Sequence, residues 1–462
     1  MPSFRGRSTI YLFQIFNSLS FWVILGPPIV LITTWIGGGS EAVGIVTSIM
    51  PFLTIFQIPS TRYIERLGYR RVMLTGWTGR TIMLLGIVIL PFLKDDWPAS
   101  KLVALLIFCI FAWSFLRGLT NASWMPWIRS LVPREQRGRF FAGQHIFIRT
   151  TSLLILFLSG VILGKNPTAM RFSLIYAISF CSAMISIQFL ARVPSVDIAH
   201  EEKVHIPVFK AIRNILKQVN YRRFLYFAFC WTFANKSFDA FSVLYLKTQA
   251  NFLDRDILWL SAIGSGAMIF ILIIAGRLLD RWGSRPIMHL CMGGTIVYLA
   301  IWFLLAQEVI GAFFVLMVVL YIIFGIMRAT VWIGISRLTL FSVPRENSIM
   351  ALAIYTTGIG LSAGTSPLLW GFILERVHGG IITPYGYFFL TSVILNILAI
   401  AFLRRVEEKK AEPTMYVALE LLTQPMRSLV QLMSYFPRSQ HSRQDHTIYS
   451  EAAETKARKS DN

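Results

Sequence analysis

The chain has 462 residues and a formal net charge of +21, yet only 15% of its residues are charged and 55% are hydrophobic. Soluble domains are about 45–50% apolar and about 25% charged. This composition excludes a soluble enzyme or a soluble nucleic-acid-binding protein and indicates a membrane protein with several spans. The lipid bilayer, and not a nucleic acid, is the expected partner of its basic residues.

Hydropathy predicts twelve membrane-spanning helices, because a bilayer core of about 30 Å requires roughly 20 apolar residues per helix. The helices are expected at about residues 9–34, 42–64, 71–93, 101–127, 140–164, 172–191, 222–246, 257–279, 286–306, 311–337, 348–374 and 384–404. The first span follows the N-terminus without a small-residue cleavage site, which argues against a removable signal peptide. The expected fold class is an all-α membrane protein.

The basic residues gather in the loops that join alternate helices. These loops hold Arg62, Arg66, Arg70 and Arg71, then Arg129, Arg134, Arg137 and Arg139, then Arg277, Arg281 and Arg285. Lys and Arg are enriched in cytoplasmic loops of membrane proteins. Both termini are therefore expected in the cytoplasm, and the expected location is a bacterial cytoplasmic (inner) membrane.

The longest of these loops, residues 192–221, divides the chain into an N-terminal bundle (1–191) and a C-terminal bundle (222–405). Within the loop, Val208, Ile212, Ile215 and Val219 share one helical face, and Lys210, Arg213 and Lys217 share the other. This pattern is typical of a helix on an anionic membrane surface, although a solvated linker helix fits it too. Residues 406–462 form a tail that is expected to be partly disordered.

Two charged stretches repeat at matching places in the two bundles. "TRYIERLGYRR" (61–71) precedes the third helix, and "AGRLLDRWGSRP" (275–286) precedes the ninth. "LVPREQ" and "SVPREN" follow the fourth and tenth helices, and Asn17 and Asn235 occupy the first and seventh. The chain is therefore predicted to be a duplicated six-helix unit.

The second stretch resembles the G-x-L-x-D-R-x-G-x-R signature of the major facilitator superfamily. The first stretch is a diverged copy, with Thr61 where the family prefers Gly and Glu65 where it prefers Asp. The resemblance implies two pseudo-symmetric six-helix bundles and a latch that joins them when the protein opens outward. The latch residues it implies are Glu65, Arg66, Gly68, Arg70, Gly276, Asp280, Arg281, Gly283 and Arg285.

Elementary chemistry gives these motif residues a physical role. Gly276 would permit close helix approach, and Gly283 a sharp turn. Asp280 would accept hydrogen bonds from the N-terminus of a neighbouring helix. The alternative is that the motif holds ordinary cytoplasmic charges and turn glycines.

Six ionisable residues fall within the predicted spans: Arg80, Arg117, Arg149, Lys236, Asp239 and Arg328. Such residues are costly in a bilayer and normally face a cavity or a partner. Arg117 and Arg328 each lie 16 residues before a loop proline, Pro133 or Pro344, which predicts similar depths on helices four and ten. They would bind the solute or couple its transport to an ion. The alternative is that they form a structural pair between helices. Arg80 and Arg149 are expected to have structural roles nearer the cytoplasmic ends.

Lys236 and Asp239 are three residues apart and so share a helical face. They would form a self-neutralising local pair, or Asp239 would carry protons with Lys236 keeping it ionised until solute binds. Asn17 and Asn235 complete the candidate solute and ion site. Five embedded cations against one acid favour an anionic solute, because arginine pairs well with carboxylate and phosphate.

The sequence therefore predicts a monomeric secondary transporter that moves a small, anionic solute by alternating access with proton coupling. A proton-linked multidrug antiporter is an alternative, although helix five lacks the Gly-Pro pairing of such proteins. A non-transporting receptor or scaffold is the other. No catalytic motif occurs, and the scattered histidines and the single cysteines, at positions 109, 181, 230 and 291, predict no enzyme activity, metal site or cofactor.

Overall fold

The computed structural model describes residues 7–133, 136–196, 208–344, 348–377, 380–408 and 412–423. These residues form helices and connecting turns. The N-terminal half contains α1 (Arg7–Leu25), α2 (Pro27–Trp35), α3 (Ser40–Leu53), the 3-10 helix η1 (Thr54–Phe56), α4 (Gln57–Leu67), α5 (Tyr69–Ile89), the 3-10 helix η2 (Leu90–Leu93), α6 (Ala99–Asn121), α7 (Trp124–Leu131), α8 (Arg137–Leu163) and α9 (Ala169–Ala191).

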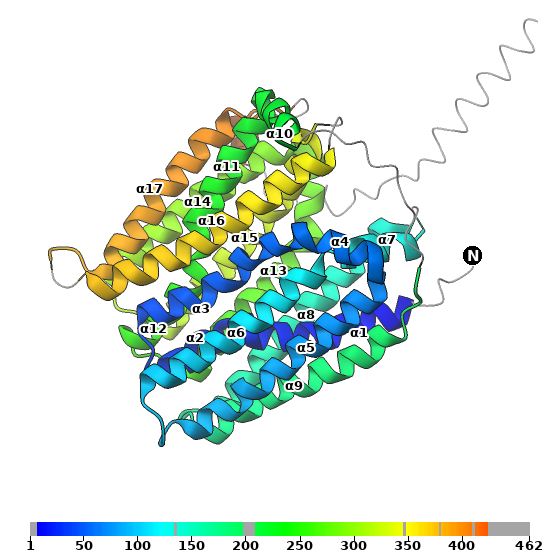
Figure 1. Ribbon diagram of the computed structural model, residues 1–462. Helices are drawn as coiled ribbons and strands as arrows, with labels where there is room; N and C mark the ends of the chain where they lie inside the picture. The colour runs from blue at the N-terminus through cyan, green and yellow to red at the C-terminus, as the bar shows by residue number, and fades with distance from the viewer. Residues whose placement is uncertain are drawn as a thin grey trace, which may run out of the picture.

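The C-terminal half contains the remaining described helices. They are α10 (Val208–Lys217), α11 (Val219–Lys236), α12 (Phe238–Thr248), α13 (Asp254–Trp282), α14 (Ser284–Ala306), α15 (Phe314–Ser342), α16 (Ser348–Arg376), α17 (Pro384–Arg404) and α18 (Thr414–Thr423). Figure 1 shows the halves side by side, with α3 against α16 and α8 against α13 at their junction.

Ten helices of the described chain are long and apolar enough to cross a membrane, so the protein is a multi-pass integral membrane protein. The two remaining predicted spans are interrupted. The second consists of α3, η1 and α4, with Pro51 near its break, and the seventh of α11 and α12, which are separated at Ser237. A helix break inside a membrane protein requires new partners for the freed backbone groups. This architecture confirms the predicted fold class.

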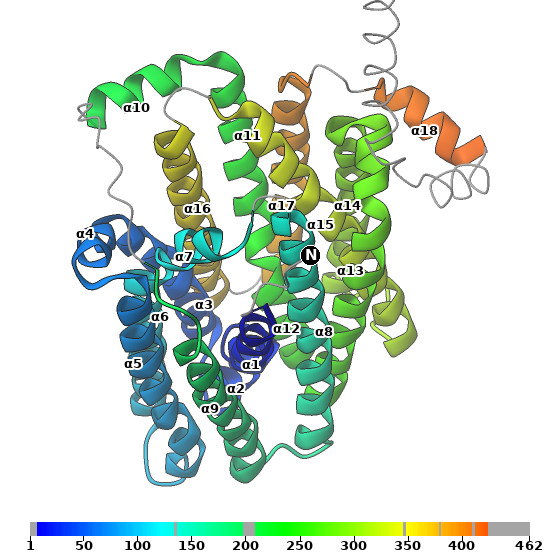
Figure 2. The ribbon, with the colours of Figure 1, turned by 90° about the vertical axis from the view of Figure 1, so that its right-hand side faces the viewer.

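The two ends of the bundle differ. We call "basic end" the end formed by the turns at Gly68 and Gly283, by α10 and by α18, and "far end" the end formed by the turns at residues 36–39, 164–168 and 249–253. The halves pack together through α3 and α16, α8 and α13, and α2 and α12. At the basic end, α10 and α18 lie over the C-terminal half, apart from α4 and α7 (Figure 2).

Helix α10 coincides with the predicted amphipathic helix, but its apolar face differs from the prediction. Ile215 is buried against Tyr221 and its neighbours in the C-terminal half, whereas Val219 begins α11 and is 48% exposed. The side chains of Val208, Lys210 and Ile212 lie outside the described part of the structure. The helix packs on α11 and α16, so part of its apolar face meets protein. Of the predicted tail, α18 is described, and residues 424–462 lie outside the described residues.

Candidate functional site

The break in helix seven creates the centre of the candidate site. Ser237 separates α11 from α12, and its hydroxyl lies 2.5 Å from the hydroxyl of Ser366 on α16. The Ser366 hydroxyl also lies 2.6 Å from the carbonyl oxygen of Phe233. These contacts satisfy polar groups at the break. They place Asp239 in the first turn of α12, where the helix dipole favours a negative charge.

Asp239 lies between two cations, Arg328 on α15 and Lys236 at the end of α11. The guanidinium of Arg328 donates to both carboxylate oxygens, with Nη2 2.7 Å from Oδ2. The Nζ atom of Lys236 lies 3.5 Å from Oδ2. We call these three residues the central ion cluster. Its side chains are between 26% and 39% exposed, so the cluster is partly accessible.

Arg149 on α8 approaches this cluster from the N-terminal half. Its guanidinium lies 5.6 Å from the ring of Trp22 and interacts electrostatically with both Arg328 and Asp239. One turn earlier, His145 contacts Trp332 with ring centroids 5.7 Å apart. Trp332 is one turn after Arg328 on α15. The same faces of α8 and α15 therefore bring Arg149 and Arg328 toward one another.

A second pair of cations, Arg80 and Arg117, lies within the N-terminal half. Arg80 is buried, donates to Oδ1 of Asn17 and lies 3.9 Å from the Trp77 ring. Trp77 also donates to Asn17, at 3.2 Å. Arg117 lies 5.3 Å from the ring of Phe21 and interacts electrostatically with Arg80. These cations are supported by aromatic faces, which attract cations by their quadrupole.

The central cations outnumber the acids. Among the described residues, Asp239 is the carboxylate that pairs with Arg328 and Lys236, and no carboxylate pairs with Arg80, Arg117 or Arg149. Five cations and one acid leave a net charge of +4. An excess of positive charge within a membrane is costly unless a counter-ion is present.

The structure places the predicted site residues in different surroundings. Arg328 lies on the unbroken helix α15, as its spacing from Pro344 predicts, but α6 ends at Asn121, four residues after Arg117. Helix four is therefore divided between Arg117 and its loop proline, whereas its counterpart, helix ten, is continuous from Arg328 to Ser342. Asn235 is buried and donates to Oδ1 of Asn396 at 3.0 Å, while Asn17 holds Arg80.

The two signature loops share one backbone conformation. Gly68 has φ 80° and ψ 154°, and Gly283 has φ 89° and ψ 164°. This region of backbone space is essentially restricted to glycine. Arg70 donates to the carbonyl oxygen of Ala191, and Arg66 is exposed. The side chain of Glu65 lies outside the described part of the structure. The turn role predicted for Gly283 is confirmed.

In this conformation, two residues of the second signature loop have surroundings that differ from the predicted ones. A Cβ atom added at Gly276 would meet nothing within 4 Å, so this glycine does not permit close helix approach in this conformation. Asp280 accepts from Arg337 at 2.7 Å and not from a helix N-terminus. The N-terminus of α14 is instead capped by Glu408, whose carboxylate accepts from the amides of Ser284 (3.0 Å) and Arg285 (2.8 Å). No motif or spacing in the sequence links this distant acid to the loop.

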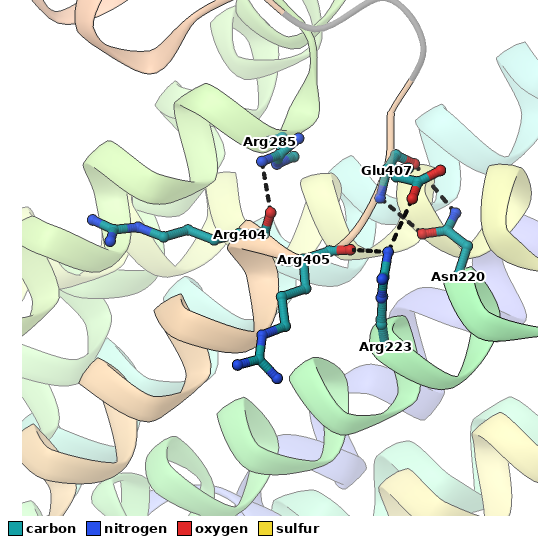
Figure 3. Close-up of polar contacts among 6 residues, drawn as sticks. All are labelled: Asn220, Arg223, Arg285, Arg404, Arg405 and Glu407. Carbon is teal, nitrogen blue, oxygen red and sulfur yellow. Dashed lines mark hydrogen bonds and ion pairs between the residues drawn. The ribbon is translucent and has the colours of Figure 1, made fainter.

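The segment after α17 fastens the basic end of the C-terminal half. Figure 3 shows Arg285 donating to the carbonyl oxygen of Arg404, at 2.7 Å. In the same view Arg223 donates to the carbonyl oxygen of Arg405 and to Glu407, at 3.1 and 2.9 Å. Farther on, α18 buries Val417 in a cluster with Leu279, Trp282 and Ile287.

Glu420 of α18 pairs with Arg281, a residue of the second signature loop, and its other oxygen accepts from Nε1 of Trp282 at 3.1 Å. The described tail helix therefore holds the signature loop by an ion pair and by apolar packing. Asp280, Arg281 and Arg285 thus have described partners in the C-terminal half or in the tail helix. Sequence analysis did not identify this contact.

A glycine stripe on α16, which sequence analysis also missed, forms the main contact between the halves. Gly360, Gly364 and Gly371 follow one another on the helix face that meets α3. A Cβ atom at Gly364 would lie 2.8 Å from the Phe52 ring, and one at Gly371 would lie 2.9 Å from Cα of Gly44. Small residues at such spacing are the usual signal for close helix packing in membranes.

Comparisons with known proteins agree with this geometry. The family model described as Major Facilitator Superfamily matches residues 10–315 and, in a second match, 256–436. The comparison with curated proteins found no match.

Solved transporter structures share the fold. A mutant of the nucleoside transporter NupG has a TM-score of 0.68 at 14% identity, covering 87% of this chain and 100% of its own. A bacterial homologue of the iron transporter ferroportin in its inward-facing state has a TM-score of 0.66 at 15% identity, covering 88% and 99%. The xylose transporter XylE from E. coli, in an inward-open conformation, has a TM-score of 0.67 at 14% identity, covering 88% and 97%.

Proposed function

Because this chain belongs to the Major Facilitator Superfamily of transporters, we propose that it moves a small anionic solute across a membrane by alternating access. The observation that carries the substrate class is the net charge of +4 on the embedded ionisable residues. The central ion cluster and Arg149 lie where the two halves meet, as solute sites in transporters of this architecture do. An anion at that place would offset the cations, whereas a metal ion or a cationic drug would increase their repulsion.

We assign the basic end to the cytoplasm of a bacterial cell, since Lys and Arg mark cytoplasmic loops. The halves pack on each other through α3 and α16 and, toward the far end, through Glu41 and Arg376, which pair at 3.3 Å. We infer from this packing a monomer that is closed at the far end, toward the outside, and open to the cytoplasm.

The two signature loops would act as latches in the opposite conformation. When the basic end closes, Asp280 exchanges Arg337 for a partner in the N-terminal half, and the loop at Gly68 does the same toward the C-terminal half. The exposed position of Asp280, 68% accessible, supports such an exchange. An exposed ion pair contributes about 0–1 kcal/mol, so it breaks easily.

Proton coupling is proposed to occur at Asp239. A proton on this carboxylate weakens its pairing with Arg328 and Lys236, and so frees both cations for an anion. Solute and proton would then move together. Replacing Asp239 by Asn imitates the protonated acid, and the variant should exchange solute across the membrane without accumulating it in a pH gradient.

Uptake into proteoliposomes tests the proposal. Purified protein is reconstituted, and the uptake of labelled lactate, benzoate, succinate, phosphate, xylose and uridine is measured with and without an inward proton gradient. We expect one of the anions to accumulate, and accumulation to depend on the gradient. Accumulation of a neutral solute alone would contradict the anionic class, and accumulation that persists in the Asp239→Asn variant would place coupling elsewhere.

A further inference from the structure

We propose that Arg149 and Arg328, one from each half, form a clamp for the anionic group of the solute, and that Asp239 occupies Arg328 when the solute is absent. This inference rests on the proposed function and specifies its binding site. Arg149 takes a role that its position in the sequence did not indicate. The solute group that the clamp fits is a carboxylate or a phosphate, because a guanidinium binds either through paired hydrogen bonds.

The face of α8 that carries Arg149 contacts the C-terminal half on both sides of this residue. One turn before Arg149, His145 touches Trp332 of α15, and one turn after it, Ser152 lies 3.4 Å from Ser265 of α13. Residues at such spacing line one face of a helix. Arg149 therefore projects from the face of α8 that meets the C-terminal half, between two contacts that fix its direction.

The two arginines differ in their present partners. Arg328 holds the carboxylate of Asp239 through both of its terminal nitrogens, Nη1 and Nη2, whereas no described carboxylate forms an ion pair with Arg149, which lies near the ring of Trp22. Asp239 is therefore the internal counterpart of the solute anion: it satisfies Arg328 in the same geometry that a free carboxylate would adopt. A solute must displace it or bind while it is protonated.

The clamp also links binding to the movement of the halves. Arg149 and Arg328 repel each other, and this repulsion opposes the approach of α8 and α15 as the basic end closes. An anion between them replaces repulsion by two attractive contacts. Solute binding thereby favours the closed arrangement, which a transporter needs before it can open on the other side.

Arg117 offers a matched comparison, because it is also an embedded arginine of the N-terminal half. Its electrostatic partner is Arg80, and it lies beside Phe21. It has no described contact with the central ion cluster. Substitution of Arg117 and substitution of Arg328 should therefore act independently, in contrast to substitution of Arg149 and Arg328.

Titration calorimetry on the purified full chain tests the clamp, with lactate, benzoate, succinate and inorganic phosphate as probes. We expect Arg149→Gln to weaken binding of the anion that the wild type binds by about tenfold or more. Asp239→Asn should strengthen it, because the competing carboxylate is lost. The losses from Arg149→Gln and Arg328→Gln should sum to more than the loss of the double variant, while those of Arg117→Gln and Arg328→Gln should add.

Two controls separate the outcomes. Arg222→Gln removes an exposed cation of α11 and should leave affinity unchanged. The Asp239→Asn, Arg328→Gln double variant shows whether a loss in Arg328→Gln comes from the unpaired acid or from the missing clamp. Unchanged affinity in Arg149→Gln, with binding intact in the wild type, overturns the clamp and leaves the proposed function standing. Absence of binding of every anion to the wild type overturns the substrate class and the clamp together.

Discussion

Gly44 and Gly371 meet backbone to backbone where α3 crosses α16. A Cβ atom built at Gly44 would lie 2.5 Å from the carbonyl oxygen of Pro367 and 2.9 Å from Cα of Gly371. Neither backbone can yield as a flexible side chain would. This crossing joins the two halves, so a methyl group at either position acts on the equilibrium between conformations as well as on packing.

Gly44→Ala and Gly371→Ala should each shift the protein away from the conformation described here. Overpacking of a tight contact costs about 1–3 kcal/mol, which corresponds to a change of about 5- to 150-fold in a conformational equilibrium. The measurement is the labelling rate of single cysteines at the two ends by a membrane-impermeant thiol reagent. Gly293→Ala is the matched control, since its Cβ would meet nothing within 4 Å. Equal labelling in all three variants would contradict the prediction.

Gly68→Ala and Gly283→Ala should destabilise the protein, because both positions need a backbone conformation that other residues rarely adopt. The expected cost is about 1–3 kcal/mol at each position. Thermal unfolding of the purified variants measures it, again with Gly293→Ala for comparison. A melting temperature equal to that of the wild type would show that the turns can be rebuilt without positive φ.

Asp280→Asn should reduce transport much more than it reduces stability. In the present conformation the carboxylate contributes one exposed ion pair with Arg337, worth about 0–1 kcal/mol. Its proposed role belongs to the outward-open conformation. Transport at equal membrane abundance is compared with the melting temperature of the same variant. Wild-type transport would show that Asp280 is not part of a latch.

Val417→Asp should detach α18 from the signature loop, because Val417 is fully buried among Leu279, Trp282 and Ile287. A charge at this position would be buried without a partner. Hydrogen exchange of the amides of residues 414–423 should become faster. Met415→Asp is the control on the same helix, because Met415 is 70% exposed. Unaltered exchange in the Val417 variant would mean that the described packing does not hold the helix.

The fold was largely predictable from the sequence. The length of each apolar segment and the paired turns at Gly68 and Gly283 depend only on residues that are close together in the sequence, so they can be recognised directly. The helix breaks were harder to predict. Interruption at Ser237 depends on Ser366, more than a hundred residues away, whose hydroxyl supports the break. A hydropathy profile averages over neighbouring residues, so it does not report a contact between residues that are distant in the sequence.

For the candidate site, the sequence predicted which charged residues lie within the membrane but not how these residues are arranged. The sequence identified the charges of the central ion cluster and predicted by symmetry that Arg117 acts with Arg328, whereas Arg149 is the arginine of the N-terminal half that interacts electrostatically with the cluster. Symmetry alone does not show that helix four is divided: α6 ends soon after Arg117, while α15 continues to Ser342. The capping role of Glu408 was hidden for a similar reason, since it depends on where the chain returns after α17.

The unequal helix breaks give the two halves different mechanical properties. Three helices of the N-terminal half are divided: helix one at Gly26, helix two at residues 54–56 and helix four at residues 122–123. Of their counterparts, helix seven is divided at Ser237, while α13 and α15 are continuous over 29 residues each. A divided helix bends at its break, and a continuous one transmits force along its length. During a transport cycle the C-terminal half would therefore rotate as a rigid unit, and most of the bending would occur in the N-terminal half.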